Sequence, residues 1–228
     1  IGSGSGCRYC FRARPLTIFA HIPVLLEEVT SNLVSEKTGI FVDATVGGAG
    51  HSSIILERYK YLRLIGLDAD ETALEIAGEK LAVFGDRVTL IRGNFKDLKA
   101  ILKQAGISSI NGILFDLGLS TYQILGKRGF SFNDDAFLDM RMDNREPLTA
   151  YDIVNGYSYD DLKGIIEEYG EEYNAYRIAK AIVDERKKRP ITTAKELSSV
   201  ILKAKRRTGK IHPATKTFQA IRIEVTGE

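Results

Sequence analysis

Residues 40–52 read IFVDATVGGAGHS, and this stretch decides the fold class. The apolar run that ends at Asp43 predicts a short buried strand, and the glycines at 47, 48 and 50 predict a sharp turn into a helix. A helix that starts directly after such a turn presents free backbone N–H groups to a ligand. Taken alone, the pattern fits a dinucleotide, another nucleoside-bearing ligand or a plain tight turn about equally well.

Apolar segments alternate with helical patterns from residue 40 to residue 118. The apolar segments are rich in Ile, Leu and Val, as strands buried on both faces are, and they continue at 62–68, 88–93 and 112–118. Apolar residues recur at helical spacing between them, in 52–59, 71–84 and 98–104. This order predicts an α/β fold with a doubly wound, Rossmann-like parallel sheet. A preceding amphipathic helix, with Val24, Leu25, Val29 and Leu33 on one face, is expected to pack on the edge of the sheet.

The pattern after Asp116 is helical, and its helices have recognisable starts. Ser158 followed by Asp161, and Thr193 followed by Glu196, are typical of helix N-caps with an acidic residue three positions later. Pro213 is expected to be the first residue of a helix. These signals predict a helical insertion in an α/β core.

The predicted organisation has four parts. Residues 1–19, with the GSGSG run and the Cys7/Cys10 pair, are expected to be a non-native or disordered leader. The core is expected at 20–124, the helical insertion at 125–212, and the start of a returning core helix at 213–228. Because a doubly wound sheet usually has six or seven strands and only four are found, we expect the last strands of the sheet to be missing.

Charge is distributed unevenly along a nearly neutral chain of net charge +2. Residues 133–173 hold 12 acidic and 3 basic side chains, whereas residues 174–212 hold 12 basic and 3 acidic side chains. Such segments fit two readings, a mutually neutralising pair of solvated faces or a basic face that follows the phosphates of a nucleic acid, chiefly 186–189 and 203–210. The sequence has no run of eighteen apolar residues, so a soluble cytoplasmic protein is expected, with no membrane partner.

Polar and aromatic residues follow the predicted strands where each one ends. Asp68 ends the second strand, Phe95 follows the third, and Asp116 ends the fourth. The carboxyl ends of parallel strands meet at one edge of a sheet, so these side chains are expected to face a single ligand, with a carboxylate on the ribose hydroxyls. Each residue also has a plainer reading, since Asp68 could cap a helix, Phe95 could lie in the core and His51 could cap or pack. No metal-ligand cluster is spaced for catalysis.

Several longer motifs together resemble one family. They cover most of the chain from residue 21 to residue 225, and they read HIPVLLEEV (21–29), DATVGGAGHS (43–52), IGLDAD (65–70), FDLGLSTYQ (115–123), RGFSF (128–132), LDMRMD (138–143), RIAKAIVDERKKRPITTAKEL (177–197) and HPATKTFQAIRI (212–223). These motifs are similar to those of the bacterial 16S rRNA cytosine-N4 methyltransferases, the MraW family. Where that family commonly reads GVSSPQ, this chain has GLSTYQ, so Tyr122 replaces a proline.

The resemblance implies S-adenosylmethionine as the cofactor and methyl transfer to the N4 amine of a cytidine near the decoding centre. It implies small-subunit ribosomal RNA, free or in the 30S particle, as the partner, and it leaves room for a homodimer. The cofactor contacts that it carries onto this chain are Ala49, Gly50, His51, Asp68, Phe95, Asp116 and Gln123. Asp116, with Ser120 nearby, is the candidate acceptor for a proton of the reacting amine.

Three other functions fit the sequence less well. A methyltransferase of the same fold could act on another substrate, and a truncated chain could bind cofactor or RNA without turnover. An NAD-dependent dehydrogenase is a more distant alternative, because a glycine turn followed by an acidic residue about twenty positions later also occurs in dinucleotide-binding folds.

Overall fold

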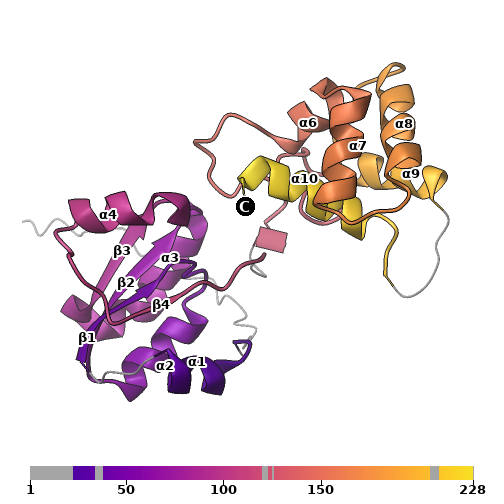
Figure 1. The fold of residues 1–228 in the computed structure, drawn as a ribbon. Coiled ribbons are helices and arrows are strands. Elements are labelled where there is room, and N and C mark those ends of the chain that lie inside the picture. The colour runs from indigo at the N-terminus through magenta and orange to yellow at the C-terminus, as the bar shows by residue number, and fades with distance from the viewer. Residues whose placement is uncertain (1–22, 34–37, 120–122, 125, 206–210, 228) are drawn as a thin grey trace, which may run out of the picture.

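A four-stranded parallel sheet forms the first half of the chain in the computed structural model, which describes residues 23–33, 38–119, 123–124, 126–205 and 211–227 (Figure 1). Within these residues the strands are β1 (Thr38–Asp43), β2 (Tyr61–Asp68), β3 (Val88–Arg92) and β4 (Gly112–Leu114), in the order β3-β2-β1-β4. The register aligns Asp43 with Leu114 on β4, and Asp68 with Arg92 on β3. The predicted α/β class is confirmed.

Helices cover both faces of this sheet because successive strand residues point to opposite sides. Phe41 and Leu64 face α2 (Gly50–Arg58) and α3 (Glu71–Leu81), whose apolar residues join them in one buried cluster. Val42 and Ile65, the next residues along, face a second cluster that includes residues of α4 (Leu98–Gln104). The chain therefore has the doubly wound layering that the alternation predicts.

The helix before the sheet follows the prediction only in part. It is α1 (Leu26–Asn32), and Val29 and Leu33 pack against the cluster that contains α2. Val24 and Leu25, which were expected on the same apolar face, are each 63% exposed. Both lie before the first helical residue, where the helical spacing no longer applies.

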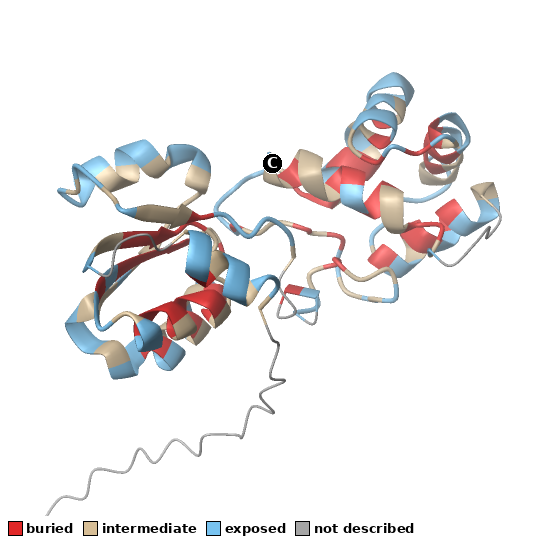
Figure 2. Ribbon diagram, turned by 60° about the horizontal axis from the view of Figure 1, so that its bottom comes forward, coloured by how far each residue is buried: buried red, intermediate tan, exposed pale blue. Residues whose placement is uncertain are grey.

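Among the described residues, five further helices make a separate unit with its own buried cluster. Figure 2 shows the buried residues of these helices on the sides that face one another. Capping boxes start three of them, at Thr149, Ser158 and Thr193, which confirms the two starts expected from the sequence. The helices are α6 (Ala150–Gly156), α7 (Tyr159–Glu168), α8 (Ala175–Arg186), α9 (Ala194–Ala204) and α10 (Thr215–Thr226).

The last helix differs from its prediction in start and in packing. Helix α10 begins at Thr215 with Ala214 as its N-cap, so Pro213 precedes the helix and is not its first residue. Its apolar face, with Phe218 and Ile221, is buried among α6, α7 and the other helices of this unit. Residues 213–228 were predicted to begin a return to the sheet core, but the described part of this helix completes the helical unit. The apolar spacing of α10 fixes which face is buried and does not indicate the partner.

The order of the strands places a switch point beside β1. The chain runs outward from β1 through β2 to β3, and then crosses to the other side of β1 to form β4. Ligands of open α/β sheets bind outside the carboxyl ends of the strands at such a point. In this chain the glycine turn after Asp43 and the segment after Leu114 flank it. Among the described residues, no helix has both the length and the apolarity needed to cross a membrane.

Candidate functional site

The turn after β1 is held to both neighbouring strands by backbone hydrogen bonds. The N–H of Val46 donates to Leu67 of β2 at 2.7 Å, and the N–H of Ala44 donates to Leu114 of β4 at 2.9 Å. Gly47 (φ 50°) and Ala49 (φ 54°) are both in the left-handed region, which glycine adopts freely and alanine adopts at a cost. This backbone is therefore fixed by its neighbours at the switch point.

The beginning of α2 leaves backbone donors free for a ligand. Ala49 is the N-cap residue, and no side chain caps the helix. The Ser53 N–H donates to the Ala49 carbonyl at 3.1 Å, as the first turn of the helix requires. A Cβ on Gly50 would lie 2.8 Å from the ring of Pro23, so the chain packs closely at this point. An uncapped helix start of this kind favours an electron-rich ligand group.

Asp68 is hydrogen-bonded to the turn after β1, a contact that the sequence did not indicate. One carboxylate oxygen accepts the Gly47 N–H at 2.9 Å, and the other accepts the Asp70 N–H at 2.9 Å. Burial raises the pKa of this half-buried carboxyl above its usual value. A carboxylate has about four lone pairs, so Asp68 keeps acceptor capacity for ribose hydroxyls.

Asp43 is a buried structural carboxyl at the end of β1. The Ser52 hydroxyl donates to one of its oxygens at 2.6 Å, and the Thr45 N–H donates to the other at 3.3 Å. Removal from water raises the pKa of Asp43 to about 6, against these two hydrogen bonds, which lower it. Asp43 thus ties the strand end to the first turn of α2.

His51 and Asp116 face each other across the switch point. Nε2 of the buried His51 lies 2.9 Å from the Val24 carbonyl oxygen, which can only accept, so this nitrogen carries a proton. Nδ1 lies 3.7 Å from a carboxylate oxygen of Asp116, whose side chain is 54% exposed. The Asp116 N–H donates to the Thr45 hydroxyl at 2.7 Å, which fixes the backbone after β4. Asp116 therefore has one side toward His51 and one side open to solvent.

Phe95 lies just beyond β3, in the 3-10 turn η2 (Phe95–Asp97), and is half-buried against the α4 side of the sheet. Its ring meets that of Phe115 edge to face, with centroids 5.8 Å apart. Phe115 is the more exposed of the two, at 45%. The aromatic surface at this edge thus includes Phe115, which the sequence reasoning missed; its position next to Asp116 was the available signal.

Gln123 reaches the same edge through Asp70. Its amide donates to the buried carboxylate of Asp70 at 3.3 Å, two residues beyond Asp68. Ser120, the second candidate catalytic residue, lies outside the described residues. The structure thus brings Ala49, Gly50, His51 and Asp116 together directly. Asp68 and Phe95 lie at the adjoining strand ends, and Gln123 joins them through Asp70. No cluster of three or more metal-ligating side chains occurs in the part of the chain described here.

A family model described as the MraW methylase family matches residues 18–228. The chain belongs to the MraW methylase family. Ribosomal RNA small subunit methyltransferase H of Sulfurihydrogenibium sp. (strain YO3AOP1) is 54% identical over 211 residues, which are 91% of this chain and 72% of that protein. The protein of the same name from Brevibacillus brevis is 50% identical over 216 residues, 92% and 68% of the two chains. A solved structure of a putative rRNA-methylase from Clostridium thermocellum aligns over 41% of this chain and 49% of that one, at 23% identity and a TM-score of 0.35.

The basic tract of this MraW-family chain, residues 186–189, is less available to a nucleic acid than its sequence suggests. Arg186 donates to the carbonyl oxygens of Val154, at 2.7 Å, and Tyr157, so it caps the end of α6. Lys187 and Lys188 are exposed, although each lies within 3.7 Å of a carboxylate on the preceding turn. The guanidinium of Arg186 is thus used inside the helical unit, and its contact with RNA phosphates stays a prediction.

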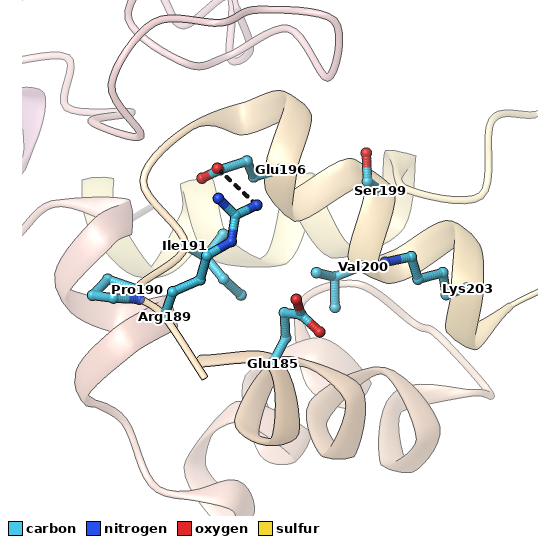
Figure 3. Close-up of a pocket in the computed structure, with 8 residues that line it drawn as sticks. All are labelled: Glu185, Arg189, Pro190, Ile191, Glu196, Ser199, Val200 and Lys203. Carbon is cyan, nitrogen blue, oxygen red and sulfur yellow. Dashed lines mark ion pairs between the residues drawn. The ribbon is translucent and has the colours of Figure 1, made fainter. Parts of the chain in front are cut away.

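A small hollow lies beside this tract, between the end of α8 and α9 (Figure 3). The Arg189 guanidinium points toward Glu196 there and forms an ion pair with it at 3.2 Å. Lys195 and Lys205 pair with Asp135 and Glu172 of the acidic segment, so the two oppositely charged segments do neutralise each other in part. The hollow is part of the helical unit and not of the strand-end site.

Asp43 should make stability depend on pH in an unusual direction. Its raised folded-state pKa, about 6 against 3.8, means that stability is lost as pH rises from about 4 through 6. That difference corresponds to about 3 kcal/mol at neutral pH. Replacing Asp43 with Asn should remove this contribution, so the variant should gain stability relative to the wild type between pH 4.5 and 7.5 in denaturant unfolding. A constant difference between the two proteins across that range would contradict the prediction.

Proposed function

We propose that this chain transfers a methyl group from S-adenosylmethionine to the N4 amine of a cytidine in small-subunit ribosomal RNA. The observation that carries the proposal is the convergence of the glycine turn, Asp68 and Asp116 at one switch point in a chain of the MraW methylase family. The names of its relatives, which this chain matches over 68–72% of their length, support the RNA substrate. The cytoplasm as location, the 30S particle as substrate form and a homodimer remain predictions.

The residues at the strand ends suit an adenosyl ligand. A Cβ at Gly47 would meet only the Thr45 carbonyl oxygen, at 3.8 Å, so a ligand can approach the backbone there, and the uncapped start of α2 supplies N–H donors. Asp68 can accept from ribose hydroxyls, and the rings of Phe95 and Phe115 offer apolar surface for a base. When bound, S-adenosylmethionine supplies an electrophilic methyl group on a sulfonium.

Asp116 is placed to serve the acceptor amine. The lone pair of cytosine N4 is delocalised into the ring, so an acceptor for one N–H makes the nitrogen more nucleophilic. Asp116 combines a fixed backbone with a carboxylate that is open to solvent, and one of its oxygens lies 3.7 Å from Nδ1 of His51. Beyond this, the chain has to hold the two reactants in line.

The direct test is incubation of the purified chain with tritiated S-adenosylmethionine and small-subunit RNA, followed by mass spectrometric mapping. The expected product is N4-methylcytidine at a single position. Methyl groups on another class of molecule would favour a same-fold enzyme with another substrate. If the chain bound S-adenosylmethionine but transferred no methyl group, it would be a binding fragment without catalytic turnover. If it bound NAD instead, it would be a dehydrogenase.

Removing the Asp68 carboxylate should weaken cofactor binding. Asp68→Ala should lower the affinity for S-adenosylmethionine by about 1–3 kcal/mol, because ribose hydroxyls lose their acceptor and Gly47 loses the bond that holds the turn. Calorimetry measures this loss. Glu75→Gln, at an exposed position one turn further along α3, serves as the control and should bind normally. An unchanged affinity in Asp68→Ala would contradict the assignment.

Neutralising Asp116 should affect turnover more than binding. Asp116→Asn keeps the shape of the side chain but accepts a proton poorly, so kcat should fall by about 10²-fold or more while cofactor affinity changes little. Single-turnover methylation kinetics, read against calorimetry, separate the two effects. Wild-type kinetics in this variant would remove the acceptor role.

The exposed lysines of the basic tract should contribute to RNA affinity without Arg186. Lys187→Gln with Lys188→Gln should flatten the salt dependence of RNA binding by about 1–2 ions, because each phosphate contact releases about 0.7–0.9 counterions. Lys99→Gln with Lys103→Gln, on exposed positions of α4, removes the same charge from the other unit and should leave the slope unchanged. If RNA affinity depended on salt equally in the two double variants, the basic tract would be a solvated face without a role in RNA binding.

A further inference from the structure

Arg92 connects the end of β3 to the segment that precedes the helical unit. One guanidinium nitrogen donates to Asp143 at 3.1 Å and to Asn144 at 2.6 Å. Another donates to Glu71, at the start of α3, at 2.9 Å. The Arg92 side chain is only 22% exposed and that of Asp143 only 11%, so this ion pair is partly shielded from water and from salt. These contacts link two segments that are 51 residues apart in the sequence, and we call them the first tie between the sheet and the helical unit.

A second tie runs beside the first. Asp70, the buried N-cap of α3, accepts from the Arg128 guanidinium as well as from Gln123. The other end of the Arg128 guanidinium donates to the carbonyl oxygens of Arg141 and Met142, at 3.3 and 3.4 Å. A buried carboxylate needs such partners, because an unpaired charge in the interior costs several kcal/mol.

Both ties start next to Asp68. Arg92 is its register partner on β3, and the N–H of Asp70 donates to the Asp68 carboxylate. The sheet-side anchors are therefore the immediate neighbours of the residue proposed to hold the ribose. Loss of either contact would therefore change how the helical unit is held beside the strand-end site.

The other ends of the ties are fixed in the helical unit. In the LDMRMD motif, Leu138 and Met140 are at most 1% exposed and lie in the core of the helices, three to five residues from Asp143. Arg145 also binds Asp143 through its side chain and backbone, and the side-chain bond is the main reason that the pKa of Asp143 falls to about 2. Asp143 is thus an ionised group on a segment that the helical core holds in place.

We propose that Arg92 is a positioning residue, which with the Asp70–Arg128 pair sets the helical unit beside the cofactor edge. This inference rests on the proposed function, since it gives the helical unit the task of presenting RNA to the methyl group. Charge-assisted hydrogen bonds from a guanidinium to a carboxylate are stronger than neutral ones, so they suit a positioning role. In-line transfer is sensitive to such placement, because an error of about 1 Å can cost about 10²-fold in rate.

Arg92→Gln is the informative variant because Arg145 still compensates Asp143 when Arg92 is lost. It should fold, bind S-adenosylmethionine within about twofold of the wild type, and lose about tenfold or more in kcat on small-subunit RNA. Arg92→Lys should recover part of the rate. Arg145→Gln is the matched control, since it removes an equal charge from the same carboxylate without crossing between the units, and its kcat should stay within about twofold.

A distance measurement tests the tie without relying on activity. Spin labels at Lys99→Cys on α4 and Asp160→Cys on α7, both exposed, report the spacing of the units once Cys7 and Cys10 are changed to Ser. The distance distribution should broaden in Arg92→Gln and stay narrow in Arg145→Gln. An unbroadened distribution, or wild-type kcat in Arg92→Gln, would overturn the proposal. Broadening in a chain whose wild type methylates no RNA would support the tie and refute the proposed function instead.

Discussion

The structure depends on the bond between the Asp68 carboxylate and the Gly47 N–H, which fastens the end of β2 to the turn after β1. The turn includes two left-handed residues, Gly47 and Ala49, and an alanine adopts this conformation only when its surroundings enforce it. Backbone bonds to Leu67 and Leu114 complete the constraint from both sides. The ligand edge is therefore shaped before any ligand binds, which lowers the ordering cost of binding.

The same edge also carries the ties to the helical unit, so two tasks are combined in neighbouring residues. Asp68 faces the turn, while Asp70 and Arg92 face the segment that leads to the helices. The two carboxylates at the end of β2 therefore have different roles. Asp68 accepts a hydrogen bond from the turn after β1, and Asp70 accepts one from Arg128, on the segment that leads to the helices. The family motif at 138–143 is the matching half, with apolar residues in the helical core and Asp143 on Arg92.

Much of this could be predicted, because local patterns decide it. The strand alternation, the glycine turn and the N-caps at Ser158 and Thr193 each depend on residues close in sequence, and the structure confirms them. The packing of α10 and the capping role of Arg186 could not be predicted, because each depends on contacts with residues far away in the chain. For the same reason a count of basic residues overstated the charge available to RNA. The roles of the predicted site residues in cofactor binding stay predictions.

The three buried apolar clusters are separate, and the ties between sheet and helices described above are ion pairs and hydrogen bonds. Contacts between exposed charges weaken as mobile ions accumulate around them, whereas partly buried ion pairs are screened much less. Because the side chains of Arg92 and Asp143 are only 22% and 11% exposed, this tie should hold at ionic strengths that disrupt exposed ion pairs. A molecule built in this way should keep the spacing of its two halves next to a polyanion, where mobile ions are concentrated.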